Sequence, residues 1–236
     1  MYFEVLVPPP LGAEKNMALD EELLHSLQQF PRSLLRFYKW TTICATYGYF
    51  CDPFKGLNQQ RIFEKNIQLA RRPTGGGIIF HHCDLAFAVL VPSTHAAYSI
   101  NPLDNYAFIN HVLIEAIREF GISGELKLLQ EEPEKNLSPY FCMTKPTKFD
   151  ILLAGRKVGG GAQRRTKYGY LHQGSIALSL PAVDLLQEIF LPGVSPDAML
   201  QISHPLLGQT CSNAQFNQAK QDLQSLLFKS FQKVSH

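Results

Sequence analysis

A run of three glycines at residues 75–77 is the part of this chain that most suggests chemistry, and a basic pair, Arg71 and Arg72, precedes it closely. Glycine loses more backbone freedom on folding than any other residue, so three in succession are costly. The run therefore predicts a loop that approaches a ligand with its N–H groups, and the arginines predict that this ligand is anionic. The simpler alternative is a flexible hairpin connection with incidental charge.

The spacing excludes two common phosphate-binding motifs. No Lys-Ser or Lys-Thr pair follows the glycines, as a P-loop requires, and contiguous glycines do not fit the G-x-G-x-x-G dinucleotide fingerprint. A second glycine cluster, at residues 159–161, follows Lys157. Because most lysines are exposed, the residue pattern alone favours a solvated hairpin at this second cluster.

The elements that must position these residues are strands on both sides of the first glycine run. Strands are expected at 67–72 and 78–81, and residues 85–91 are apolar on both faces, which indicates a central strand. Other strands are expected at 2–7, 34–40, 43–50, 149–154 and 170–180, with a return strand from 157. Helices are expected at 12–30, 53–66, 105–120, 183–190 and 213–233, and a loop at 129–147. The apolar face of the first helix would be Leu19, Leu23, Leu27 and Phe30.

The bulk composition describes an ordinary globular protein of 236 residues, 45% hydrophobic and 18% charged. The formal net charge of +2 argues for neither nucleic-acid nor membrane binding. The N-terminus has no signal-peptide pattern, and the longest apolar run, 85–92, is far below the roughly 20 residues that span a bilayer. We therefore expect a cytoplasmic protein. The five cysteines form no C-x-x-C pair, so no zinc site or disulfide framework is expected.

The sequence around the first glycine run resembles a known motif. Arg-Arg-x-Thr-Gly-Gly-Gly-Ile-Ile-x-His, with Asp-Leu shortly after, is similar to the lipoate–protein ligase A family and its octanoyltransferase relatives, within the biotin/lipoate ligase superfamily. The resemblance covers nearly the whole chain. It implies an α+β fold in which residues 1–236 form one catalytic domain, with a mixed, mostly antiparallel sheet and flanking helices. No C-terminal accessory domain of the larger ligases is expected here.

The resemblance also implies residue roles. Lys157 matches the lysine that holds both the acyl carboxylate and the phosphate of an acyl-adenylate, where a fixed ammonium lowers the repulsion between two anions. Residues that would surround the same ligand are Arg72, Thr74, Gly75, Gly76, Gly77, Ile79, His81, Gly161 and Ala162. Arg72 and Thr74 would contact its phosphate and carbonyl, and the three glycines would close over it. Ile79 and His81 would flank the nucleotide.

Gly161 and Ala162 would border the same ligand.

The first reading is an ATP-dependent lipoate–protein ligase. Lipoate and ATP, with Mg2+, would give lipoyl-AMP, and a carrier-domain lysine would then attack the mixed anhydride. The implied partners are lipoyl carrier domains of 2-oxoacid dehydrogenase complexes or the glycine cleavage H protein, with a separate accessory protein as a further possibility. No nucleic acid, membrane or resident metal is expected.

Cys142 supports an alternative. It lies four residues before Pro146 and eight before Asp150, a placement similar to that of the nucleophilic cysteine in the octanoyltransferase relatives. There the thiol takes the acyl group as a thioester without ATP, and a neighbouring cation such as Lys157 would activate it. The wording at 82–85 is closer to the octanoyltransferases, whereas Gly77 follows the ligases. A non-catalytic lipoyl- or nucleotide-binding module is the third reading, and the basic run 164–167 is interpreted as a solvated face rather than a nucleic-acid site.

Overall fold

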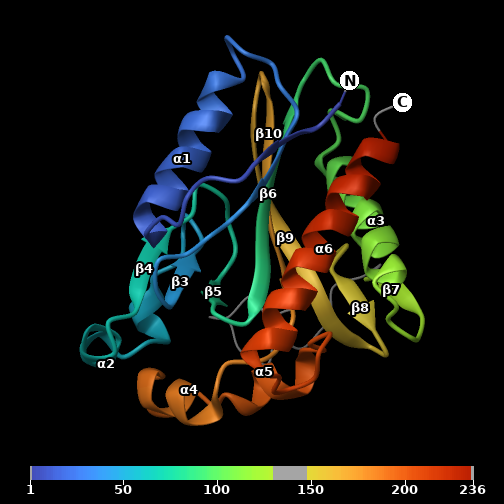
Figure 1. The fold of residues 1–236 in the computed structure, drawn as a ribbon. Helices are drawn as coiled ribbons and strands as arrows, with labels where there is room; N and C mark the ends of the chain where they lie inside the picture. The colour runs from blue at the N-terminus through green and yellow to red at the C-terminus, as the bar shows by residue number, and fades with distance from the viewer. Residues whose placement is uncertain (1, 130–147, 235–236) are drawn as a thin grey trace.

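The computed structural model describes residues 2–129 and 148–234. Its main element is a seven-stranded sheet in the order β1-β2-β6-β10-β9-β8-β7 (Figure 1). The strands are β1 (Glu4–Leu6), β2 (Leu34–Phe37), β6 (Asp84–Pro92), β10 (Gly169–Ala177), β9 (Arg156–Thr166), β8 (Ile151–Leu153) and β7 (Leu126–Leu128). All neighbours are antiparallel except β1 and β2, which run parallel.

A second, three-stranded sheet holds the first glycine run. Its order is β4-β3-β5, from β4 (Gln68–Arg71), β3 (Cys44–Tyr47) and β5 (Ile78–His81). β3 is parallel to β4 and antiparallel to β5. Residues 72–77, which we call the glycine loop, connect β4 to β5. The expected strands on both sides of the loop are therefore present.

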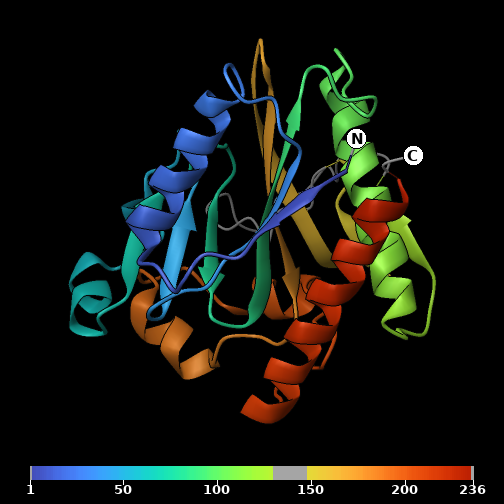
Figure 2. The same ribbon diagram turned by 45° about the horizontal axis from the view of Figure 1, so that its top comes forward.

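Helices lie on both faces of the large sheet (Figures 1 and 2). α3 (Pro102–Glu119) and α6 (Asn213–Lys233) cover one face, where Leu113 and Leu227 join the buried apolar cluster of the sheet. α1 (Ala13–Ser26) lies on the other face, which the small sheet also occupies. Three short helices pack against the small sheet: α2 (Gln59–Glu64), α4 (Val183–Ile189) and α5 (Asp197–Ile202). A 3-10 helix (Pro53–Lys55) precedes α2.

The fold class expected from the sequence is confirmed: an α+β domain with mixed, mostly antiparallel sheets and flanking helices. β6 is buried along its whole length and central, as its apolar run predicted. The expectations missed β7 and α5, and α3 begins at Pro102 rather than at residue 105 because Asn101 caps it there. No helix in the described ranges is long and apolar enough to cross a membrane.

The expected apolar face of the first helix was partly right. Leu27 is buried and Leu23 packs against the same apolar cluster, but α1 ends at Ser26, Phe30 is 58% exposed and Leu19 is only half-buried. The buried face also includes two polar residues, Asn16 and Asp20. A periodicity argument assigns polar residues to solvent, but these two meet a buried arginine from the next layer.

The second glycine cluster lies inside a strand rather than in a loop. Residues 159–161 belong to β9 and pair with residues 174–176 of β10. Glycine is required at these positions because other atoms occupy the space that a Cβ atom would fill: the carbonyl oxygen of Ser175 at Gly159, and the side chains of Asp150 and His172 at Gly160 and Gly161.

Candidate active site

The guanidinium of Arg72 holds the glycine loop from beneath. Nη1 donates to the carbonyl and hydroxyl oxygens of Thr46, each at 2.8 Å, and Nη2 donates to the carbonyls of Gly75 at 3.0 Å and Gly77 at 2.8 Å. The residue is only 4% exposed. Arg72 was expected to contact a phosphate, but in this structure its fork of donors fixes the carbonyls of the loop. Its contact with a ligand stays a prediction.

The glycine loop also lies close to the end of β3. The N–H of Gly48 donates to the carbonyl of Gly77 at 3.3 Å, and a Cβ atom on Gly48 would lie 1.9 Å from the carbonyl oxygen of Gly76. Gly76 has a φ of 94°, which favours glycine. With these carbonyls turned toward the protein, the N–H groups of Gly75 and Gly76 donate to no acceptor in the described part of the chain. Such exposed amides can bind an anion or a developing oxyanion.

A narrow pocket beside the loop lies between the two sheets. Its walls include Tyr38, Trp40, Ile79, His81, Gln173 and Ser175. A second pocket shares Ile79 and Ser175 with it and is mainly apolar, with walls that include Ile78, Phe80, Ala177, Leu180 and Met199. The walls of both pockets are mainly apolar, with polar side chains such as His81, Gln173 and Ser175 among them, which suits a ligand with an apolar chain and a polar group.

His81 is held in a buried hydrogen-bond network at the polar end of this pocket. Its Nδ1 lies 2.9 Å from Oδ2 of Asp84, and its Nε2 lies 2.7 Å from the hydroxyl of Thr46. Ser175 donates to the same Asp84 oxygen at 2.6 Å. Burial raises the pKa of Asp84, but the charge and hydrogen bond of His81 and the hydrogen bond of Ser175 outweigh it and lower the pKa. Asp84 is thus a carboxylate that orients His81. Sequence reasoning named His81 and missed Asp84 and Ser175.

Lys157 lies on the same side of the large sheet as the pocket. Its Nζ is 2.7 Å from Oδ2 of Asp150, and both side chains are buried. A Cβ atom on Gly160 would lie 2.0 Å from Oδ1 of Asp150 and 3.1 Å from Cε of Lys157, so the ion pair covers Gly160. Gly160 is paired with Ser175, and directly paired residues face the same side of a sheet. The structure thereby brings the two glycine-rich constellations to one face.

The remaining predicted residues of β9 divide between the two faces. Ala162 pairs with Gln173 and shares the pocket side. Gly161 faces the opposite side, where a Cβ atom would lie 2.2 Å from Nε2 of His172. The position of Gly161 is therefore explained by packing against a histidine, and a ligand contact there stays a prediction.

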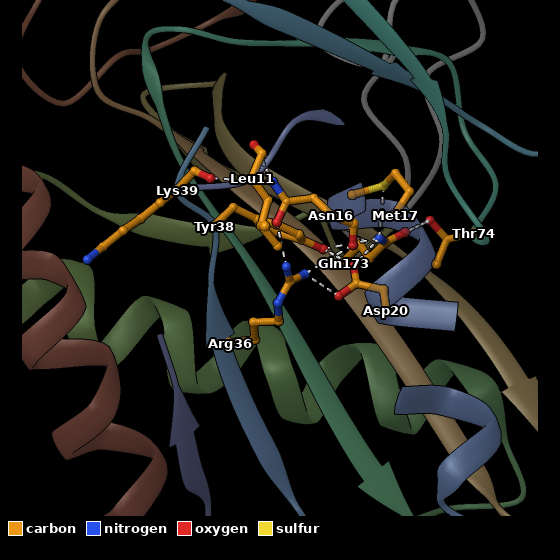
Figure 3. Close-up of polar contacts among 9 residues, drawn as sticks. All are labelled: Leu11, Asn16, Met17, Asp20, Arg36, Tyr38, Lys39, Thr74 and Gln173. Carbon is orange, nitrogen blue, oxygen red and sulfur yellow. Dashed lines mark hydrogen bonds and ion pairs between the residues drawn. The ribbon is translucent and has the colours of Figure 1, made fainter. Parts of the chain in front are cut away.

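A buried polar network ties Thr74 to α1 and β2 (Figure 3). Asp20 accepts from Nη1 of Arg36 at 2.5 Å, from Nε2 of Gln173 at 2.6 Å and from the hydroxyl of Tyr38. Oε1 of Gln173 accepts from the hydroxyl of Thr74 at 2.7 Å. Burial raises the pKa of Asp20, while Arg36 and the hydrogen bonds from Tyr38 and Gln173 oppose that rise. The only sequence signal for this network was an arginine within an otherwise apolar strand.

His172 is a fully buried histidine on the opposite face, with Nδ1 3.0 Å from Nε2 of Gln163. Burial lowers its pKa from 6.5 to about 3. As the pH falls below 6.5, His172 therefore becomes protonated in the unfolded chain, whereas in the folded protein it stays neutral down to about pH 3. This site should make the free energy of unfolding fall by about 1.4 kcal/mol per pH unit over that range.

Urea unfolding at several pH values between 6.5 and 4.5 measures this effect. His172→Gln should have a shallower decline than the wild type, because the variant has no group to protonate there. His111→Gln, at an exposed histidine, should decline as the wild type does. Parallel curves for the wild type and His172→Gln would contradict the assignment of a neutral buried histidine.

Cys142, the predicted nucleophile of the transferase reading, lies outside the described residues. The described cysteines are Cys44, Cys51, Cys83 and Cys211. Burial raises the pKa of Cys83 to about 11 and raises that of Cys44 further. These two thiols stay protonated at neutral pH and are poor nucleophiles.

The cations expected at the phosphate, Arg72 and Lys157, contact protein oxygens in this structure. Within the described ranges, no group of three His, Cys, Asp or Glu side chains is placed to hold a metal ion.

Comparison with known proteins gives consistent matches. The model of the lipoyl protein ligase A/B catalytic domain matches residues 12–221. Octanoyltransferase LipM of Bacillus subtilis (strain 168) is 34% identical over 182 residues, which are 75% of this chain and 65% of that protein. The chain thus spans 65% of the length of this curated relative.

Two solved structures share the fold. Protein Ta0514 of T. acidophilum with bound lipoic acid has a TM-score of 0.70 at 20% identity, covering 99% of this chain and 96% of that one. A lipoate-protein ligase A bound with ATP has a TM-score of 0.68 at 20% identity, covering 99% and 95%. At this identity the likeness establishes the architecture alone.

The names of the curated relatives correct the functional expectation. An ATP-dependent lipoate–protein ligase was expected, but relatives at 31–34% identity are octanoyltransferases. The ligase expectation was wrong because it relied on Gly77, which matches the ligase motif. Residues 82–85 are more similar to the motif of the octanoyltransferases.

Proposed function

This chain belongs to the lipoyl protein ligase A/B catalytic domain family, and from that membership we propose that it is an acyltransferase. It moves an octanoyl group from a carrier thioester to a lysine of a lipoyl carrier domain through a thioester on Cys142. The observation that carries this proposal is the 34% identity with an octanoyltransferase. The two pockets, which share Ile79 and Ser175 and have mainly apolar walls, support an acyl substrate.

The reaction needs no nucleotide, because the donor thioester is already activated. The Cys142 thiolate attacks the donor carbonyl carbon, a C–S bond forms, and the carbonyl oxygen becomes an oxyanion. The bond to the donor sulfur then breaks, and the donor leaves as a thiol after gaining a proton. In the second half the lysine amine attacks the new thioester, a C–N bond forms, the amine loses a proton and the Cys142 thiolate leaves.

The described residues suit the demands of these steps. The N–H groups of Gly75 and Gly76 are the donors for the oxyanion, and removing one such donor typically costs 10²–10³-fold in rate, about 3–4 kcal/mol. The apolar pocket beyond Ile79 takes the acyl chain. The Lys157 ammonium, set beside Asp150 on the pocket side of the sheet, favours the thiolate form of the nucleophile.

The experiment that tests this proposal is a transfer assay without nucleotide. The protein is incubated with an octanoyl thioester of an acyl carrier protein and a lipoyl domain, and the lipoyl domain is weighed by intact mass spectrometry. We expect one octanoyl group on its lysine. A matched reaction replaces the thioester with free octanoate or lipoate plus ATP and Mg2+, and should leave the lipoyl domain unmodified. Modification only in that second reaction would overturn the proposal.

A further inference from the structure

We propose that Asp20 and Gln173 are positioning residues for the glycine loop, which they hold in place through a one-way chain of hydrogen bonds ending at Thr74 (Figure 3). The inference deepens the proposed function and rests on it for its kinetic test. Gln173 is part of the pocket wall, and Asp20 acts through it from behind.

The first observation is an ion pair with no exposure at all. Asp20 and Arg36 lie 2.5 Å apart, and both side chains are 0% exposed. Removing two charges from water costs as much as or more than their attraction returns, so such pairs are weak contributors to stability. Arg36 also donates to the side chain and the carbonyl of Asn16, which fixes the guanidinium in α1. A rigid, costly pair beneath a pocket points to a role in orientation.

The second observation is that the direction of the chain is set by chemistry. An ionised carboxylate only accepts hydrogen bonds, and the permanently charged guanidinium of Arg36 favours that ionised form of Asp20. Gln173 must therefore turn its NH2 group to Asp20, 2.6 Å away, and its carbonyl oxygen to Thr74, 2.7 Å away. Because that oxygen also only accepts, the hydroxyl of Thr74 must be the donor.

The third observation is that the glycine loop is anchored to both sheets. The guanidinium of Arg72 ties the loop carbonyls to Thr46 of the small sheet. Gln173 holds Thr74 from the large sheet. The pocket lies between these sheets, and Gln173 is part of its wall. The chain from Asp20 thus sets where the amides of Gly75 and Gly76 stand relative to that wall. A displacement of about 1 Å at such a site typically costs 10²-fold in rate.

The first test breaks the chain with variants of the same shape. Thr74→Val and Gln173→Met should each lower kcat of octanoyl transfer by roughly 10- to 100-fold. Because both remove the same contact, the double variant should lose no more than the worse single variant. Effects that multiply, or single variants with the kcat of the wild type, would overturn the proposal.

Matched controls come from elsewhere in the chain. Gln232→Met removes a hydrogen bond to the carbonyl of Phe3, and Thr166→Val removes one to the carbonyl of Gly169. Each makes the same chemical change at a position far from the loop in sequence and outside both pocket walls. Both should keep the kcat of the wild type, so that a loss of kcat is assigned to the chain and not to lost stability.

The second test reverses the chain. Gln173→Glu places two carboxylates face to face, and Asp20→Asn removes the acceptor that orients Gln173, so each should lower kcat. In the double variant Asp20→Asn/Gln173→Glu, the new amide can donate to the new carboxylate, which still accepts from Thr74. We expect that this double variant recovers at least tenfold over Gln173→Glu. A double variant that is worse than both singles would contradict the directional chain.

A readout independent of turnover separates this proposal from the proposed function. Amide hydrogen–deuterium exchange of Gly48 and Tyr49, whose N–H groups donate to the carbonyls of Gly77 and Thr74 in the glycine loop, should be faster in Thr74→Val and Gln173→Met than in the wild type and the controls. If the wild type transfers no octanoyl group but exchange accelerates as expected, the proposed function fails and the positioning chain stands. If exchange is unchanged in the variants and the wild type transfers the octanoyl group normally, the positioning role is excluded and the proposed function stands.

Discussion

Cys142→Ser is expected to abolish octanoyl transfer, with a loss on the order of 10³-fold or more, as nucleophile removal does in enzymes of covalent mechanism. A serine hydroxyl is almost fully protonated at neutral pH, whereas a cysteine beside a cation supplies a thiolate. Intact mass spectrometry of the wild type with the octanoyl thioester donor alone should detect an added acyl group. The variant should remain unmodified.

Cys211→Ser is the matched control, since Cys211 is a free, half-buried thiol that lines neither pocket. It should retain both the adduct and the transfer rate of the wild type. Full transfer by Cys142→Ser would exclude a thioester on this residue. An adduct that appears on Cys83 instead would assign the chemistry to the pocket thiol, against its raised pKa.

The sequence predicted those parts of the site that a single segment determines. The glycine run with its flanking strands was found because glycine has a distinct backbone cost, and β6 because its residues are apolar on both faces. These inferences need no knowledge of which other segment lies nearby. The α+β class followed from the same elements together with the family resemblance.

The parts that failed depend on pairs of distant segments. In the sequence, Asp20 is typical of the first half of a helix, and Arg36 interrupts a strand. Their structural role depends on the contact between the two side chains, which lie 16 residues apart in the chain. A periodicity argument considers one element at a time, so it placed Leu23 and Leu27 against the core correctly and missed the buried Asn16 and Asp20.

The contacts of the cationic side chains could not be predicted from the sequence either. Residue type identified Arg72 and Lys157 as notable, but it could not say which oxygens they contact. In the structure one guanidinium binds carbonyls of the glycine loop and the ammonium binds a buried carboxylate. The choice between ligase and transferase failed for the same reason, because the two activities share these residue types and differ in what surrounds them.

Lys157→Met is the second substitution with a large expected effect, and it should act in two ways. It leaves the carboxylate of Asp150 buried without its ammonium, which typically costs about 3–5 kcal/mol of folding free energy. It also removes the cation proposed to favour the thiolate and the developing negative charge, for which a loss of roughly 100-fold in kcat is expected. Urea unfolding and the transfer assay measure the two effects separately.

The double variant Lys157→Met/Asp150→Asn distinguishes catalysis from stability. Neutralising Asp150 removes the uncompensated charge, so most of the lost folding free energy should return, because it is the unpaired ion and not the missing pair that is costly. The kcat should stay low, since no ammonium has been restored on the pocket side of β9. If the double variant regains the kcat of the wild type along with its stability, Lys157 serves the fold and not the reaction. If stability returns while transfer stays slow, Lys157 serves the reaction from its place over Gly160, next to the wall that includes Ser175.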